Sequence, residues 1–301
     1  MRGEGTALMT TSRRYLILLI SSFIFLSFAL PAYASEIIVV GDTQLKPVTE
    51  IISGIKETLD FPVKVFQPAS VRGRLKDIAA REDAKVVVAL GKEALDEALQ
   101  LPPTVAVIYD LVITPPAVRR PNTTGFYMAT PVKEYVDLMK TYLHSIRRIA
   151  VVGSRSLINI LEGADHSEVS SYTVKSPFDF VSAVKQIDSA DAILLLPDVS
   201  MLTASAVEEA YLLSFKKGIP LLGISEKNVK QGALLALVFD PVNVGRRIGE
   251  NASSAIKGMD MGRIPASPPH KFELYINTET AGKMGIQISP ELARKAKKVY
   301  P

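Results

Sequence analysis

The chain has 301 residues, of which 22% are charged and 48% hydrophobic, a composition typical of a globular protein rather than a disordered or fibrous one. Its formal charge of +4 falls to +2 without residues 1–34, which hold Arg2, Arg13, Arg14 and Glu4. So small an excess does not favour binding to nucleic acid. The length suggests two lobes of roughly 100 to 150 residues, each able to bury its own core.

The chain has too few cysteines and histidines for several kinds of covalent or metal site. The chain has no cysteine, which excludes disulfides, thiolate metal sites and cysteine nucleophiles. The three histidines, His144, His166 and His270, are far apart and lack the short spacings that metal sites favour. We therefore expect no metal and no cofactor.

Residues 1–34 have the features of a secretory signal peptide. Arg13 and Arg14 precede an apolar run from Tyr15 to Leu30, and small residues then occupy both positions of an Ala-x-Ala cleavage site ending at Ala34. A retained membrane anchor is the alternative, but about sixteen apolar residues fall just short of the roughly 17–25 that span a bilayer. We expect cleavage after Ala34 and a periplasmic mature protein.

Short β-branched runs alternate with amphipathic stretches from Glu36 onward, which is the pattern of βα units on a parallel sheet. The first series predicts strands at Ile37–Gly41, Val63–Phe66, Lys85–Leu90, Thr104–Tyr109 and Thr124–Met128, and helices at Lys46–Leu59, Val71–Glu82 and Lys92–Leu99. A helix at Pro131–His144 follows, since proline suits a first helical turn.

A second series of similar size then begins. It predicts strands at Arg148–Val152, Ser170–Val174, Ala192–Leu196, Pro220–Ile224 and Leu234–Phe239, and helices at Pro177–Asp188 and Ala204–Lys217. A helix at Val242–Lys257, a loop at Gly258–Pro269, a strand at Phe272–Ile276 and helices at Thr278–Met284 and Pro290–Val299 complete the chain. Two such series predict an α/β protein with two doubly wound parallel-sheet lobes and a ligand cleft between them.

Candidate ligand-binding residues lie at the predicted strand ends, because ligands of open α/β sheets bind outside the carboxyl ends of the strands. They are Asp42, Thr43, Gln44, Gly91, Tyr109 and Asp110 in the first series, and Ser154, Arg155, Asp198, Glu226 and Asp240 in the second. The carboxylates suit an ammonium or hydroxyl group, and Arg155 suits a carboxylate. For each Asp or Ser, the alternative role is to cap the following helix. The set as a whole predicts a small polar or zwitterionic ligand.

The sequence lacks several motifs of enzymes. There is no Gly-x-Ser-x-Gly elbow, no Gly-x-x-x-x-Gly-Lys-Ser/Thr loop and no His-Glu-x-x-His helix. Gly91-Lys92 lacks the preceding glycine of a phosphate loop, and Gly41 and Gly153 do not belong to a Gly-x-Gly-x-x-Gly pattern. We expect a binding protein rather than an enzyme.

The C-terminal half resembles a known family. Within Ile219–Ala252, Gly232-Ala233 precede a predicted strand, Asp240 follows it, and Gly245-Arg246 lie on the next helix. Together with the tail Phe272–Asn277, Ala281, Lys283–Ile286 and Pro290–Leu292, these features resemble the substrate-binding proteins of ABC transporters, which include tryptophan- and tyrosine-binding members and have a type I periplasmic-binding-protein fold.

The resemblance implies a small-molecule ligand, an ABC permease in the inner membrane as partner, and three crossings between lobes, near Ser145, Phe239 and Arg263. Residues 35–144 plus 241–262 would form the N-terminal lobe, and residues 145–240 plus 263–301 the C-terminal lobe. We expect a monomer. Two alternatives to transport stay open, namely a sensor or accessory binding protein and an interaction protein with a degenerate cleft.

Overall fold

Parallel apolar strands form a first sheet. The computed structural model describes residues 36–128, 130–161, 167–198 and 200–301, so the signal-peptide prediction and His166 lie outside the described residues. The sheet order is β2-β1-β3-β4-β5, and all its strands are parallel. The strands are β1 (Ile37–Val40), β2 (Val63–Phe66), β3 (Val86–Leu90), β4 (Ala106–Val112) and β5 (Thr123–Tyr127). All residues of β1 and β3 are buried, as expected of strands covered on both faces.

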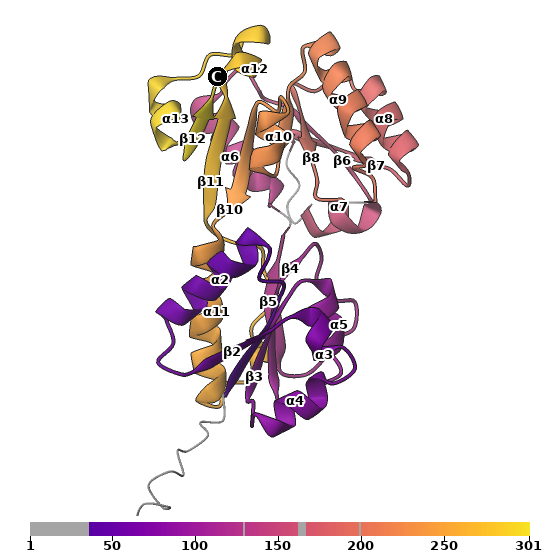
Figure 1. Ribbon diagram of the computed structural model, residues 1–301. Coiled ribbons are helices and arrows are strands. Elements are labelled where there is room, and N and C mark those ends of the chain that lie inside the picture. Colours follow the sequence, from indigo (N-terminus) through magenta and orange to yellow (C-terminus); the bar gives the residue numbers. More distant parts are fainter. Residues whose placement is uncertain (1–35, 129, 162–166, 199) are drawn as a thin grey trace, which may run out of the picture. The chain divides into compact units, whose positions relative to one another are not determined.

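Helices cover both faces of the first sheet (Figure 1). One face packs against α2 (Lys46–Glu57), α11 (Pro241–Ile256) and the short 3-10 helix η1 (Met261–Arg263). The other packs against α3 (Pro68–Val71), α4 (Leu75–Arg81) and α5 (Lys92–Ala98). The predicted helix Val71–Glu82 is interrupted at Gly73, whose φ of 67° is left-handed and ends one helix before the next begins.

The second sheet has seven strands in the order β12-β11-β10-β9-β8-β6-β7. They are β6 (Ile149–Gly153), β7 (Val169–Thr173), β8 (Ala192–Leu195), β9 (Leu221–Gly223), β10 (Leu235–Phe239), β11 (Phe272–Asn277) and β12 (Lys298–Tyr300). β11 runs antiparallel to β10, and the other pairings are parallel. β11 and the edge strand β12 therefore run opposite to the rest of the sheet, and antiparallel strands at one edge of a parallel sheet are common in doubly wound folds.

Helices also lie on both faces of this second sheet. α8 (Pro177–Gln186) and α9 (Ala204–Lys217) pack on one face, while α6 (Val132–Tyr142), α7 (Arg155–Leu161), α12 (Thr278–Lys283) and α13 (Pro290–Lys295) contribute to the core of the other. The short helix α10 (Glu226–Lys230) follows β9. α7 and α10 are absent from the sequence prediction. No helix of the described ranges is both long and apolar enough to cross a bilayer.

The packing of α6 differs from the arrangement that the predicted lobe boundary implies. Its residues Val132, Tyr135 and Met139 join the core of the second sheet, and the Tyr135 hydroxyl donates to the Gly223 carbonyl at 2.6 Å. The same hydroxyl accepts the Leu237 N–H at 3.3 Å. α6 therefore packs with the second sheet, whereas the predicted crossing near Ser145 would place it in the N-terminal lobe.

The C-terminal end also differs from the prediction. The helix expected at Pro290–Val299 ends at Lys295, and the last residues form β12, which pairs parallel with β11. The Thr278 hydroxyl donates to the Tyr300 carbonyl at 2.9 Å. Hydrogen bonds to a neighbouring strand therefore override the local helical pattern.

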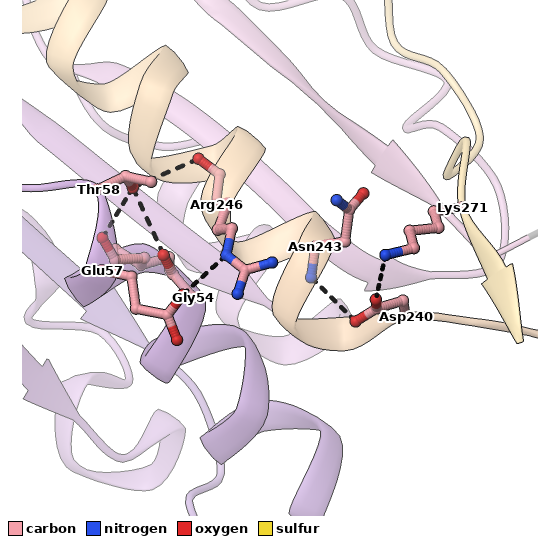
Figure 2. A network of polar contacts seen from close by, with 8 residues as sticks. Gly54, Glu57, Thr58, Asp240, Asn243, Arg246 and Lys271 are labelled. Atoms are coloured by element: carbon pink, nitrogen blue, oxygen red, sulfur yellow. Dashed lines mark hydrogen bonds and ion pairs between the residues drawn. The ribbon is translucent and has the colours of Figure 1, made fainter. Parts of the chain in front are cut away.

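α11 returns to the first sheet and lies directly beside α2. A Cβ at Gly54 would lie 2.1 Å from the Val242 carbonyl oxygen, and one at Gly245 would lie 2.1 Å from that of Ile51. The two backbones are thus in contact. Beside this contact the Arg246 Nε lies 2.7 Å from Glu57 Oε2, and the Thr58 hydroxyl donates to the Arg246 carbonyl at 3.4 Å (Figure 2).

We expect Gly245→Ala to lower the free energy of unfolding by about 1–3 kcal/mol, because the new methyl group forces two helix backbones apart. Gly282→Ala in α12 is the matched control. No heavy atom lies within 4 Å of its added Cβ, so this substitution should be neutral or should stabilise by up to about 1 kcal/mol. Urea unfolding of both variants measures the difference. Equal urea midpoints for the two variants would contradict the backbone contact between α2 and α11.

Candidate ligand-binding site

The carboxyl ends of β1, β2 and β3 surround a pocket of about 710 Å³, which we call the first-sheet pocket. Three predicted residues line it, Asp42, Gln44 and Gly91. Asp42 Oδ1 accepts the Gln44 N–H at 3.0 Å, which fixes the turn after β1. Polar and charged side chains therefore meet at this sheet edge, as the strand-end rule predicts.

Gly91 and Thr43 hold the loops of this pocket in place. Gly91 has a φ of 98°, which favours glycine, and its N–H donates to the Asp110 carbonyl at 2.8 Å. Thr43 Oγ1 accepts a hydrogen bond from Gln67 Nε2 at 2.6 Å and so links the loops after β1 and β2.

Two other candidates on β4 lie deeper. Tyr109 is 2% exposed and packs in the apolar core between the first sheet and α3, α4 and α5. Burial raises the pKa of its hydroxyl to about 12. Asp110 is 1% exposed, and neither of its carboxyl oxygens has a hydrogen-bond partner among the described residues. Burial raises the pKa of Asp110 to about 7, since the charged form loses its water.

A second pocket, of about 580 Å³, lies at the carboxyl ends of β6 and β7. We call it the second-sheet pocket; its lining includes the predicted Ser154 and Arg155, together with Ser156, Lys175 and Met201. Neither Arg155 nor Lys175 forms an ion pair with a described residue, so both cations are available to an anionic group.

Asp198 forms hydrogen bonds that order a loop of the second-sheet pocket. Its carboxylate accepts the Ser154 N–H at 3.2 Å, the Ser200 N–H at 3.2 Å and the Ser200 hydroxyl at 2.6 Å. Burial opposes ionisation, but these hydrogen bonds outweigh it and hold the pKa of Asp198 below its usual value. Asp198 therefore positions the loop after β6.

Glu226 and Asp240 contact other parts of the protein and line neither pocket. The Glu226 carboxylate accepts the Tyr300 hydroxyl and pairs with Lys230 at 3.1 Å. Asp240 caps α11 by accepting the Asn243 N–H at 3.0 Å and lies 3.6 Å from Lys271 Nζ (Figure 2). For Asp240 the helix-capping alternative is thus the role seen in the structure.

Sequence reasoning missed Gln67 in the first-sheet pocket and Lys175 in the second. Gln67 directly follows the strand β2, and Lys175 follows the predicted strand Ser170–Val174. The strand-end rule applied to every strand would have found both. Within the described parts of the chain, no group of three or more histidine, aspartate or glutamate residues could hold a metal ion.

The model of the family described as ABC transporter substrate binding protein matches residues 104–300. The chain belongs to this family. A curated relative, the tyrosine-binding protein of Clostridioides difficile (strain R20291), is 22% identical over 177 residues, which cover 55% of this chain. The match spans about half the length of that relative, 50%.

Three solved structures have the same fold. A conserved domain protein from Vibrio cholerae aligns over 88% of this chain and 99% of its own, with a TM-score of 0.57 and 20% identity. An ABC domain from Streptococcus pneumoniae in complex with L-Trp covers 87% and 99%, with a TM-score of 0.56 and 19% identity. The ligand-free, open form of a substrate binding protein with adhesive properties from Clostridium difficile covers 88% and 99%, with a TM-score of 0.66 and 12% identity. The fold is the type I periplasmic-binding-protein fold predicted from the sequence.

We expect Asp110 to make stability fall with rising pH. Its pKa is about 7 in the folded chain and near 3.8 in the unfolded chain, so between these values the folded chain binds more protons. The loss amounts to at most about 4 kcal/mol, is spread over pH 4 to 7 and is complete above pH 7. Asp110→Asn removes this contribution of residue 110 to the pH dependence of the free energy of unfolding.

Urea unfolding of the wild type and of Asp110→Asn at several pH values measures the effect as a difference, which cancels the contributions of the other carboxylates. The variant should gain stability relative to the wild type from pH 4 to pH 7 and no further above it. If the free energies of unfolding of the two proteins changed in parallel with pH, the raised pKa of Asp110 would be contradicted.

Proposed function

We propose that this protein is a periplasmic solute-binding protein that holds a small zwitterionic ligand and delivers it to an ABC permease of the inner membrane. Membership of the substrate-binding family supports the general role. The ligand class rests on the charges of the two pockets, which differ in sign.

Two carboxyl groups at the first-sheet pocket form no ion pair with a described residue. Asp42 lines it, and the unpaired Asp110 lies beside it, whereas Lys92 is held by Asp96 at 2.6 Å. The second-sheet pocket offers Arg155 and Lys175, while the nearby Asp198 uses its oxygens on Ser154 and Ser200. An ammonium group would suit the first pocket and a carboxylate the second. This division of charge is the observation that carries the proposal.

We further propose two lobes that close over the ligand. The N-terminal lobe would be residues 35–128 plus 241–264, and the C-terminal lobe residues 130–240 plus 270–301. These boundaries follow the two cores, because α6 packs with the second sheet and α11 with the first. A ligand that contacts both lobes would stabilise the closed arrangement, since it binds that state more tightly.

The relatives suggest where to begin the search for a ligand. One is named as a tyrosine-binding protein, and one solved structure holds L-Trp. Amino acids, the aromatic ones first, are therefore the leading candidates for this chain. The open volume of both pockets favours ligand binding over a degenerate cleft.

The experiment is a thermal-unfolding screen of the chain from Ser35 onward, which forms a unit of its own. The panel comprises the amino acids, sugars, nucleosides and small carboxylates. Selective binding to the folded state at about 100 times Kd should raise Tm by about 5–10 °C. An amino acid that raises Tm supports the proposal. No shift across the panel would contradict it.

Arg155→Gln tests the second-sheet pocket in the same screen. It should weaken the binding of a ligand carboxylate by about 10- to 100-fold and leave the unliganded Tm unchanged, because Arg155 is exposed. Lys185→Gln on α8 is the matched control, since it removes the same charge from an exposed position away from both pockets. Equal affinities in the two variants would exclude Arg155 from the site.

A further inference from the structure

Asp110 is a buried carboxyl group whose charged form is favoured only by the N–H of its neighbour Leu111, a contact that falls outside normal hydrogen-bond geometry. Its side chain is 1% exposed, and both oxygens are unpartnered within the described residues. Asp198, which is 7% exposed, shows the usual alternative, because its oxygens accept hydrogen bonds from Ser154 and Ser200. Buried polar groups in proteins are nearly always hydrogen-bonded, so an unpaired one needs an explanation.

The backbone at the same place is strained. The pairing of β4 with β5 shifts register between Tyr109 and Val112, so Asp110 and Leu111 together oppose Phe126. Leu111 has a φ of 57°, a left-handed conformation that is costly for a residue with a Cβ. Strain of this kind concentrates at ligand sites, where binding can release it.

The strand register places Asp110 beside the first-sheet pocket. Asp110 pairs with Leu90 of β3, and parallel partners point to the same face. Leu90, Gly91 and Leu111 all line the pocket. The Gly91 N–H also donates to the Asp110 backbone carbonyl, so the backbone of Asp110 adjoins residues that line the pocket.

Among the described residues, no cation of the elements packed around β4 pairs with Asp110. From α11, Arg247 lies with its guanidinium 4.7 Å from the centre of the Phe126 ring, and its Nη1 is also buried without a hydrogen-bond partner among the described residues. Arg246 pairs with Glu57 of α2. On β5, Tyr127 packs with the opposite core, and β3 contributes only apolar side chains. No Lys or Arg of the described chain forms an ion pair with the Asp110 carboxylate, so a positive charge would have to come from outside.

We propose that Asp110 receives the ammonium group of the ligand, and that the bulge at Asp110 and Leu111 rearranges to bring the carboxylate to the first-sheet pocket. The ligand class is therefore a primary amine, and with Arg155 an amino acid. An ammonium group has three donors, enough to satisfy both carboxylate oxygens. Its charge also compensates the buried carboxylate, which a neutral hydroxyl group does not. The inference rests on the proposed function and specifies one side of its site.

The test compares Asp110→Asn with wild type and with Asp77→Asn by calorimetric titration. Asp77 is exposed on α4, so its variant is a control for the loss of one negative charge. The probes are each amino acid that raises the wild-type Tm and the carboxylic acid that lacks its amino group. Unliganded Tm values are recorded for all three proteins, and Asp110→Asn should be no less stable than wild type at pH 8, which separates lost binding from lost folding.

We expect the wild type to bind the amino acid at least about 100-fold more tightly than the deaminated acid, and Asp110→Asn to lose that preference. Asp77→Asn should remain within about twofold of wild type. Unchanged amino-acid affinity in Asp110→Asn would overturn the assignment, as would a wild type that binds only compounds without an amino group. In both cases solute binding itself would stand. A wild type that binds nothing would overturn the proposed function as well.

Discussion

Parallel pairing of the strands is the constraint on which the candidate site depends. Because β1, β2, β3 and β4 run in one direction, their carboxyl ends share one edge of the first sheet, and β6 and β7 do the same in the second. Residues as distant in sequence as Asp42 and Gly91 therefore line one pocket. The backbone contact between α2 and α11 joins the late segment after Asp240 to this first sheet and completes its covered face.

The two pockets use their charged residues differently. In the second, Asp198 is saturated by internal hydrogen bonds and orders the loop that presents Ser154, while Arg155 and Lys175 have no ion pairs with described residues. In the first, Asp110 is buried without a partner next to a strained Leu111. One sheet thus carries cations without ion pairs among the described residues, and the other a buried carboxyl group without a partner that an ammonium group would ionise, which together suit a zwitterion.

The sequence predicted the strands well because β-branched runs bounded by polar residues leave little ambiguity, and the strand-end rule then located Asp42, Gln44, Gly91, Ser154 and Arg155 in pockets. It failed where tertiary contacts decide. The end of the helix predicted at Pro290–Val299 is instead the strand β12, paired with β11. The hydrogen bond of Tyr135 to Gly223 holds α6 against the second sheet. Tyr109 and Asp110 are adjacent in sequence and both buried, but only the strand pairing shows that Tyr109 packs on the face of α3, α4 and α5 while Asp110 pairs with Leu90, which lines the pocket.

Methionine side chains offer the most direct measurement of whether both pockets bind one ligand. Met128 lines the first-sheet pocket and Met201 the second, while Met259 is half exposed and lines neither. In a sample with carbon-13 methionine methyl groups, assigned by Met→Leu variants, titration with an amino acid that raises Tm should shift the Met128 and Met201 signals together with a single Kd and leave Met259 unchanged. A shift confined to one pocket, or different Kd values for the two signals, would contradict a single ligand held by both sheets.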